Sequence, residues 1–268
     1  VQQGFVCRGG RMLNEETYEN FWELFRSIPS LEQPQRSVTE EILNFDHAHP
    51  TCAHARLIDK DAKILDVRSM GFDNADRLAM TKLLLTPEER LDNMTIEDWF
   101  GPHFFETNFW YMWQTTFAFQ KWSSLFEFRR YMNRMIFEFP RIETLEGVTR
   151  TPYNQYESVI LPLKAYLETN GVRFETGRTV TDIDFAPGEA LTATALHFAD
   201  GSAVDLREGD VCIMTNACMT DSATLGNLHA PAPAPERKPV SAELWAKVAA
   251  KRPGLGNPEP FFGNVNES

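Results

Sequence analysis

The segment from Gln155 to Ala217 constrains the fold more than any other part of this sequence. It begins with a helical run, YESVILPLKAYLETN, which ends at Gly171, and continues with a strand pattern, VRFETG. Two further strand patterns follow, TVTDIDF and LTATALHF, with a turn at Asp200-Gly201, and the continuously apolar run DVCIMTNA closes the segment. A helix, a strand, an antiparallel meander and a return strand in this order predict an α/β fold.

The same order of elements matches the second half of a glutathione-reductase-like, Rossmann-type flavin domain. In such domains the last strand ends at the dinucleotide. No GxGxxG motif follows a strand in this sequence, so we expect the phosphate-binding turn to precede Val1. The chain starts without methionine, and its end, GNVNES, has no helix cap or polar tail. We therefore expect a segment of a longer protein.

Outside this segment the sequence predicts mainly helices. Aromatic residues at spacings of three and four within Glu15 to Ile28 predict an amphipathic helix, and SVTEEILNFDH predicts a short second one. HARLIDKDAKILDV predicts two strands joined by a turn at Asp59 to Asp61. Thr86 and Thr95 each have the pattern of an N-cap before a helix.

Aromatic side chains dominate the stretch from Trp99 to Phe128. At this density they are typical of a hydrophobic core, and we expect part of this belt to face a substrate as well. The tract APAPAPERKP, from Ala230 to Pro239, predicts an extended, exposed linker.

Composition excludes several classes of protein. The formal net charge is -12 over 268 residues, so nucleic acid is not an expected partner. The four cysteines form no CxxC pair and no signal peptide is visible, which indicates reduced thiols in a cytoplasm. No run of about 18 apolar residues is present, so the chain is not expected to span a membrane, although it could lie on one.

Four motifs in a fixed order cover essentially the whole chain: RGGRMLNEETYENFW, FEFRRYMNRM, RTPYNQYESVILPL and IMTNACMTDSATLG. Together they resemble the oleate hydratase family, also called the myosin-cross-reactive antigen family. The resemblance implies an FAD-dependent lyase that adds water across a cis double bond of an unsaturated fatty acid, typically turning oleate into 10-hydroxystearate. It also implies that the flavin undergoes no net redox change.

The resemblance further implies an FAD-binding domain interrupted by a mixed α+β substrate domain. We expect the flavin-facing elbow and its helix at 1–30, the substrate domain at 31–150, the second half of the FAD domain at 151–229, and a Pro-rich linker with the next substrate-domain segment at 230–268. Membrane contact, peripheral and on the inner face, would come through parts outside this chain. Whether the protein forms a homodimer is left open.

The elbow departs from the family pattern at one residue. The family reads Arg-Gly-Gly-Arg-Glu-Met, and its glutamate positions or activates the attacking water beside the flavin; here Met12 stands at that position. Glu15 and Glu16 become candidates for a substitute base. The resemblance places the flavin against Arg8, Gly9, Gly10, Arg11 and Met12; glycine lets the backbone approach a ligand closely.

Hydrating an isolated alkene requires a proton donor on one carbon and water on the other. Tyr131 matches the proton-donating tyrosine of the family, and an unperturbed tyrosine, with a pKa near ~10, is protonated at neutral pH. The alternative is an ordinary amphipathic residue at a helix surface. Gln155, with Asn154, matches the family's contact to the substrate carboxylate, and the alternative is a helix-start residue after Pro152.

The remaining cofactor contacts implied by the resemblance are Val180, Thr215, Asn216, Met219 and Thr220, where the family's Thr-Asn-Gly-Ser-Met reads TNACM here. We expect no metal, because the tract DHAHPTCAH matches no zinc ligand spacing; on a strand it would put His47 and His49 on one face. Two other functions remain open. One is a flavin-dependent fatty-acid isomerase or dehydrogenase, and the other is a non-catalytic fatty-acid-binding relative.

Overall fold

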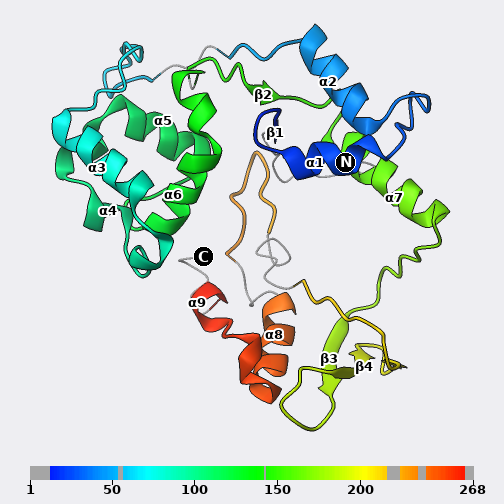
Figure 1. Cartoon of the computed structure of the whole chain (residues 1–268). Helices are drawn as coiled ribbons and strands as arrows, with labels where there is room; N and C mark the ends of the chain where they lie inside the picture. Colours follow the sequence, from blue (N-terminus) through cyan, green and yellow to red (C-terminus); the bar gives the residue numbers. More distant parts are fainter. Residues whose placement is uncertain (1–12, 54–56, 142, 216–223, 235–239, 263–268) are drawn as a thin grey trace. The chain divides into compact units, whose positions relative to one another are not determined.

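The computed structural model describes residues 13–53, 57–141, 143–215, 224–234 and 240–262 (Figure 1). The chain divides into two compact units, Val1–Val172 and Arg173–Ser268. Each unit is described by itself. No helix within the described ranges combines the length and the apolar character that crossing a bilayer requires.

Helices make up most of the first unit. They are α1 (Glu19–Arg26), α2 (Val38–Ala48), α3 (Asn74–Leu85), α4 (Ile96–Trp99), α5 (Asn108–Phe117), α6 (Leu125–Arg134) and α7 (Leu161–Thr169). Shorter 3-10 turns are η1 (Glu88–Arg90), η2 (Pro102–Glu106) and η3 (Ile136–Arg141), and one π-helical turn, η4 (Tyr156–Ile160), leads into α7. The antiparallel pair β1 (Leu13–Asn14) and β2 (Val148–Thr149) joins two distant parts of this unit.

Capping chemistry sets where several helices begin. Ser37, Asp73 and Thr95 each cap a helix whose third residue, an acid, bonds back to the cap, which forms a complete capping box. The N-cap predicted at Thr95 is therefore confirmed. The one predicted at Thr86 is wrong: this residue ends α3, where its hydroxyl donates to the carbonyl of Lys82, and only the turn η1 follows.

The aromatic belt forms the larger of two cores in the first unit, as predicted. Phe104, Trp113 and Phe128 are fully buried within it, and the Phe100 and Phe104 rings stack with centroids 3.8 Å apart. A smaller core contains Leu13, Trp22, Phe25, Ile28, Val38 and Ile42. The side chain of Tyr18 packs against both cores.

Two predictions in the first unit need correction. The helix expected from Glu15 begins at Glu19, because the preceding residues pair as β1 and then turn. The two strands expected around Asp59 to Asp61 shrink to a single bridge between Ile58 and Ile64, although the turn itself forms. Both bridge residues are exposed, so no apolar face holds a longer pair together.

The second unit contains a three-stranded antiparallel meander of β3 (Val180–Phe185), β4 (Ala193–Phe198) and β5 (Ala203–Asp205). The helix α8 (Val240–Lys251) packs on β3, where the Lys251 ammonium bonds to Asp182 and Asp184; η5 (Pro253–Leu255) and α9 (Glu259–Phe262) follow. The predicted meander and its turn at Asp200-Gly201 are confirmed.

The predicted strands VRFETG and DVCIMTNA are wrong for the residues that the structure describes. Residues 172–177 and 211–215 have no strand partner there, and Val211 and Ile213 are 84% and 83% exposed. Strands of a parallel sheet are normally buried on both faces, whereas these two side chains are exposed. The structure is thus mixed α/β, with the meander as its regular sheet. Residues 230–234 of the expected linker are exposed and irregular, as predicted.

Candidate functional site

Much of the predicted flavin contact lies outside the described residues. This holds for Arg8, Gly9, Gly10, Arg11, Met12, Asn216, Met219 and Thr220. The described candidates are Glu15, Glu16, Tyr131, Asn154 and Gln155 in the first unit, and Val180 and Thr215 in the second.

Tyr131 lies on α6 and is held at its ring, while 40% of the residue stays exposed. The rings of Phe117 and Phe119 pack edge-on against it, with centroid distances of 5.7 and 5.2 Å. Phe119 also contacts the fully buried Phe128. The larger core therefore fixes the ring of Tyr131 and leaves part of the side chain accessible, as a proton donor to a bound substrate requires.

The helix that carries Tyr131 is tied to the residues just after the elbow. Arg134, three positions along α6, donates from Nη1 to the carbonyl oxygen of Thr17, and its guanidinium lies 5.0 Å from the ring centroid of Tyr18. Residues three apart on a helix share a face. The structure thus ties the elbow exit, residues 13–18, to α6 through Arg134, about one turn from Tyr131.

Both candidate substitute bases already have a partner. Glu15 Oε2 lies 3.2 Å from His47 Nε2, and both side chains are more than half exposed. Glu16 Oε1 accepts from Arg141 Nη2 at 3.2 Å, and its backbone N–H donates to Asn14 Oδ1 at 2.9 Å. Glu16 is therefore fixed through its backbone and its side chain, whereas Glu15 is held by one exposed pair.

A buried carboxylate, Glu138, lies at the centre of this region. It is 4% exposed, and its Oε1 accepts from Asn14 Nδ2 at 2.8 Å and from Arg141 Nη2 at 2.6 Å. Burial raises the pKa of Glu138, against the opposing charge of Arg141, and the neighbouring Glu16 raises it further. Gly147 approaches so closely that a Cβ there would lie 1.8 Å from Glu138 Oε1.

The amides proposed to bind the substrate carboxylate lie just before α7. Asn154 Oδ1 accepts from the Glu157 N–H at 3.1 Å and its Nδ2 donates to the Glu157 carboxylate at 2.9 Å, so this side chain caps the π-helical turn. The helix-start role that the sequence left open was for Gln155, and Gln155 makes no side-chain cap bond to this turn. Gln155 is partly buried.

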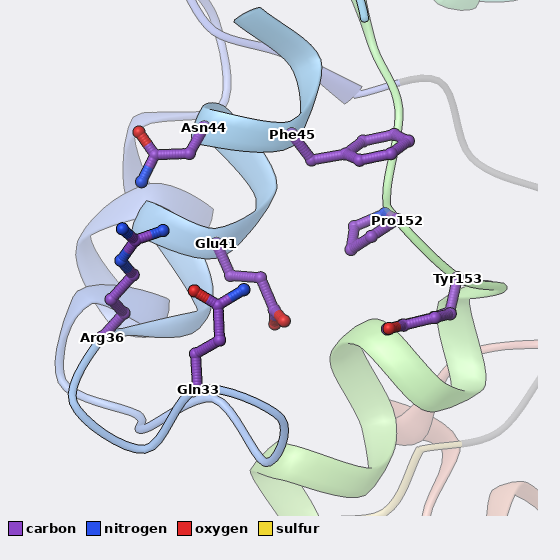
Figure 2. A pocket seen from close by; sticks show the side chains of 7 residues that line it. All are labelled: Gln33, Arg36, Glu41, Asn44, Phe45, Pro152 and Tyr153. Carbon is purple, nitrogen blue, oxygen red and sulfur yellow. The ribbon is translucent and has the colours of Figure 1, made fainter. Parts of the chain in front are cut away.

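A hollow of about 370 Å³ opens beside these amides, between α2 and the segment before α7 (Figure 2). It is lined by Gln33, Arg36, Glu41, Asn44, Phe45, Pro152 and Tyr153. The hydroxyl of Tyr153 points toward the Glu41 carboxylate, and the Gln33 amide lies beside Glu41 (Figure 2). Its described lining includes neither Asn154 nor Gln155, so the structure does not bring the predicted carboxylate contacts into this hollow.

The two described flavin candidates lie in the second unit. Val180 is the partly buried first residue of β3, and Thr215 is exposed at the end of the run 211–215. That run borders a hollow of about 490 Å³, whose walls include Ile183, Phe185 and Leu255.

Metal ligands were not expected, and the histidines at the end of α2 have other contacts. His49 Nδ1 contacts the carbonyl oxygen of Phe45, and the two histidines lie at a helix end rather than on the strand considered above. Among the described residues, Asp73, Asp76 and His103 bring ligand atoms within 4.8 Å of one another. Their geometry is that of a helix start, because both aspartates form the capping box of α3 and His103 Nδ1 lies 2.7 Å from Asp76 Oδ2.

Comparison with known proteins identifies the family. The model of the MCRA family matches residues 1–268. This chain belongs to the MCRA family. It is 44% identical over 278 residues to a protein named linoleate hydratase from Lactiplantibacillus plantarum, with 99% of this chain and 49% of that protein covered. It is 34% identical over 267 residues to an oleate hydratase from Streptococcus pyogenes serotype M49 (strain NZ131), with 98% and 45% covered. The chain thus spans about half the length of these relatives.

Membership of the MCRA family confirms the resemblance drawn from the four motifs. The sequence did not single out Asn14, Glu138 or Arg141. Asn14 lies just after the predicted elbow, and the other two follow the helix that carries Tyr131. A local signal was present, since Glu138 and Arg141 are three apart and of opposite charge. The contact with Asn14, 124 positions away, has no such signal.

Proposed function

We propose that this member of the MCRA family acts as a fatty-acid hydratase, adding water across a cis double bond of an unsaturated fatty acid such as oleate or linoleate. The observation that carries the proposal is the similarity, over nearly the whole chain, to proteins named linoleate hydratase and oleate hydratase. The partial exposure of Tyr131, on a helix that Arg134 ties to Thr17, supports it.

We further propose FAD as the cofactor, and the described residues allow a partial test of the fit. The hollow beside residues 211–215 has an apolar side of Ile183, Phe185 and Leu255 that suits a flavin ring, but the acidic Glu208 and Asp210 line it as well. Neither Val180 nor Thr215 is among its described lining residues. Arg8 and Arg11 of the elbow match the anionic part of FAD in charge. When bound, FAD would take part without net electron transfer.

The chemistry then falls to the side chains of this chain. Tyr131 donates its phenolic proton to one alkene carbon, and the oxygen of a water molecule bonds to the other carbon. That water releases a proton to Glu15, Glu16 or a backbone-held water at the elbow, and Tyr131 regains a proton from solvent. The sum is one alkene and one water converted to one alcohol.

The test uses the full-length protein with FAD, oleate or linoleate, and ¹⁸O-labelled water, with the products followed by mass spectrometry. Tyr131→Phe should lower the rate of labelled hydroxy-acid formation by about 10²- to 10⁴-fold. Tyr111→Phe is the matched control, because Tyr111 on the neighbouring helix α5 is exposed to the same extent, 40%, and should change little.

Other outcomes would overturn the proposal. A product with a shifted or additional double bond and no label would indicate the isomerase or dehydrogenase. Oleate that binds and is recovered unchanged would indicate a non-catalytic binder. Unchanged hydration by Tyr131→Phe would remove this residue from the mechanism.

A further inference from the structure

The buried carboxylate of Glu138 collects three segments that are far apart in sequence. Asn14 lies in the elbow exit, Arg141 lies in the turn η3 together with Glu138, and Gly147 is the residue just before β2. Asn14 Nδ2 donates to the carbonyl of Gly147 as well, at 3.2 Å. A single oxygen, Oε1 of Glu138, therefore organises the contact between the elbow exit and the chain after α6.

The contact does more than join two loops, because both of its branches lead to Glu16. Asn14 holds the Glu16 backbone N–H through Oδ1, and Arg141 holds the Glu16 carboxylate through the nitrogen that also binds Glu138. Thr17 then meets Arg134, on the face of α6 that carries Tyr131. Glu16 is thus fixed both at its backbone N–H and at its carboxylate.

The chemistry of the cluster also differs from that of an ordinary structural bridge. Within the described part of the chain, Glu138 Oε2 and Arg141 Nε are buried without a hydrogen-bond partner. Buried polar groups in folded proteins are usually satisfied, and replacing a buried ion pair by neutral groups is often neutral for stability. A buried carboxylate that is only half satisfied is therefore a candidate for a functional role in addition to its structural one.

We infer that Glu138 is a positioning residue, which fixes the elbow exit and the carboxylate of Glu16 against the helix that carries Tyr131. The inference rests on the proposed hydration. Glu138 would act through Asn14 and Arg141 and would not touch the substrate. Its loss should misplace the water-holding side of the site while leaving the fatty acid free to bind.

The experiment compares Glu138→Gln with Asp76→Asn in the full-length protein. Asp76 is the matched control, because it is a carboxylate of the same exposure, 4%, in the same unit. It lies in the first turn of α3, and its partner is His103. We expect Glu138→Gln to lower kcat for oleate hydration by about 10²-fold with little change in KM, since a small misplacement can cause a loss of this size. Asp76→Asn should leave kcat within a few-fold of the parent.

Hydrogen exchange followed by mass spectrometry gives a readout that does not depend on activity. Glu138→Gln should speed exchange in peptides that contain residues 13–18, whereas Asp76→Asn should not. If both variants lose thermal stability and keep kcat, or if exchange at 13–18 is unchanged in Glu138→Gln, Glu138 is a structural residue and the inference is wrong. If the parent protein does not hydrate oleate, the proposed function fails, and the exchange result alone decides whether Glu138 holds the elbow exit.

Discussion

Gly147→Ala is the substitution whose effect can be worked out most directly from the structure. A Cβ at this position would lie 1.8 Å from Glu138 Oε1, 2.4 Å from Arg141 Nη2 and 2.6 Å from Arg141 Cζ. All three distances are far below van der Waals contact. Because the neighbouring atoms belong to a buried ion pair, relief requires Glu138 and Arg141 to leave their present positions.

The expected loss follows from what Glu138 Oε1 binds. Moving it breaks the bonds from Asn14 and Arg141, and hydrogen bonds to charged groups contribute about 1.5–3 kcal/mol each. Replacing glycine restricts the unfolded chain and returns about 0.4–1 kcal/mol. The net decrease in the free energy of unfolding is therefore about 3 kcal/mol, which is typical of breaking a buried pair. This corresponds to a fall in Tm of about 6–12 °C for a unit of this size.

The assay is thermal unfolding of the full-length protein, with Gly101→Ala as the control. Gly101 has a φ of -70° and no atom within 4 Å of a Cβ, so its replacement should be neutral or slightly stabilising. Glu138→Ala removes the nearest clashing atom and releases Arg141 from its partner. The double variant Glu138→Ala/Gly147→Ala should therefore lose less than the sum of the two single losses. A Tm of Gly147→Ala within about 1 °C of the parent, or strict additivity in the double variant, would refute this account.

Two further predictions concern the larger core and the pH dependence of the pair formed by His103 and Asp76. Phe128→Ala should lower the free energy of unfolding by about 3–5 kcal/mol, because a fully buried ring is removed; in urea denaturation the exposed Leu78→Ala should shift it by no more than about 0.5 kcal/mol. The Asp76 carboxylate raises the pKa of His103 above 6.5 through their hydrogen bond, and Asp73 and Glu106 add to the shift. A raised folded-state pKa gives stability that is fully present below 6.5 and lost as the pH rises through the folded value. The deficit in Tm of His103→Asn should therefore be largest in mildly acidic buffer and shrink in alkaline buffer, and a deficit that does not vary with pH would contradict the pairing.

How far the sequence predicted the fold depends on the range of the interactions involved. The cap at Thr95 and the aromatic core between Trp99 and Phe128 were recoverable, because capping and burial leave patterns within one or two turns. The strands expected at 172–177 and 211–215 depend on partners elsewhere, and their own residues cannot supply those partners. Thr86 shows a smaller failure: a threonine before proline fits a helix start, yet here it ends a helix.

The residues of the candidate site can also be divided by the range of the interactions that reveal them. Tyr131 and Glu16 were proposed from motifs, whereas the carboxylate that binds the neighbours of Glu16 was missed because Asn14 and Glu138 are 124 residues apart. Only proximity in the fold, and no local pattern, makes Glu138 a candidate. Asn154 stays a predicted substrate contact, and in the structure its amide bonds to Glu157 at the turn before α7.

Met12 leaves the elbow without the glutamate of its family, and the two substitute carboxylates differ in a way that bears on this loss. Glu15 has only an exposed pair with His47, and such pairs fix a side chain weakly. Glu16 is fixed by Asn14 and Arg141, and the guanidinium occupies Oε1 of its carboxylate. Since Arg141 also binds Glu138, a movement of this arginine toward Glu138 would free Glu16 without leaving the guanidinium unpaired. Positioning and basicity, which one elbow glutamate combines in the family, would then be divided between Glu138 and Glu16.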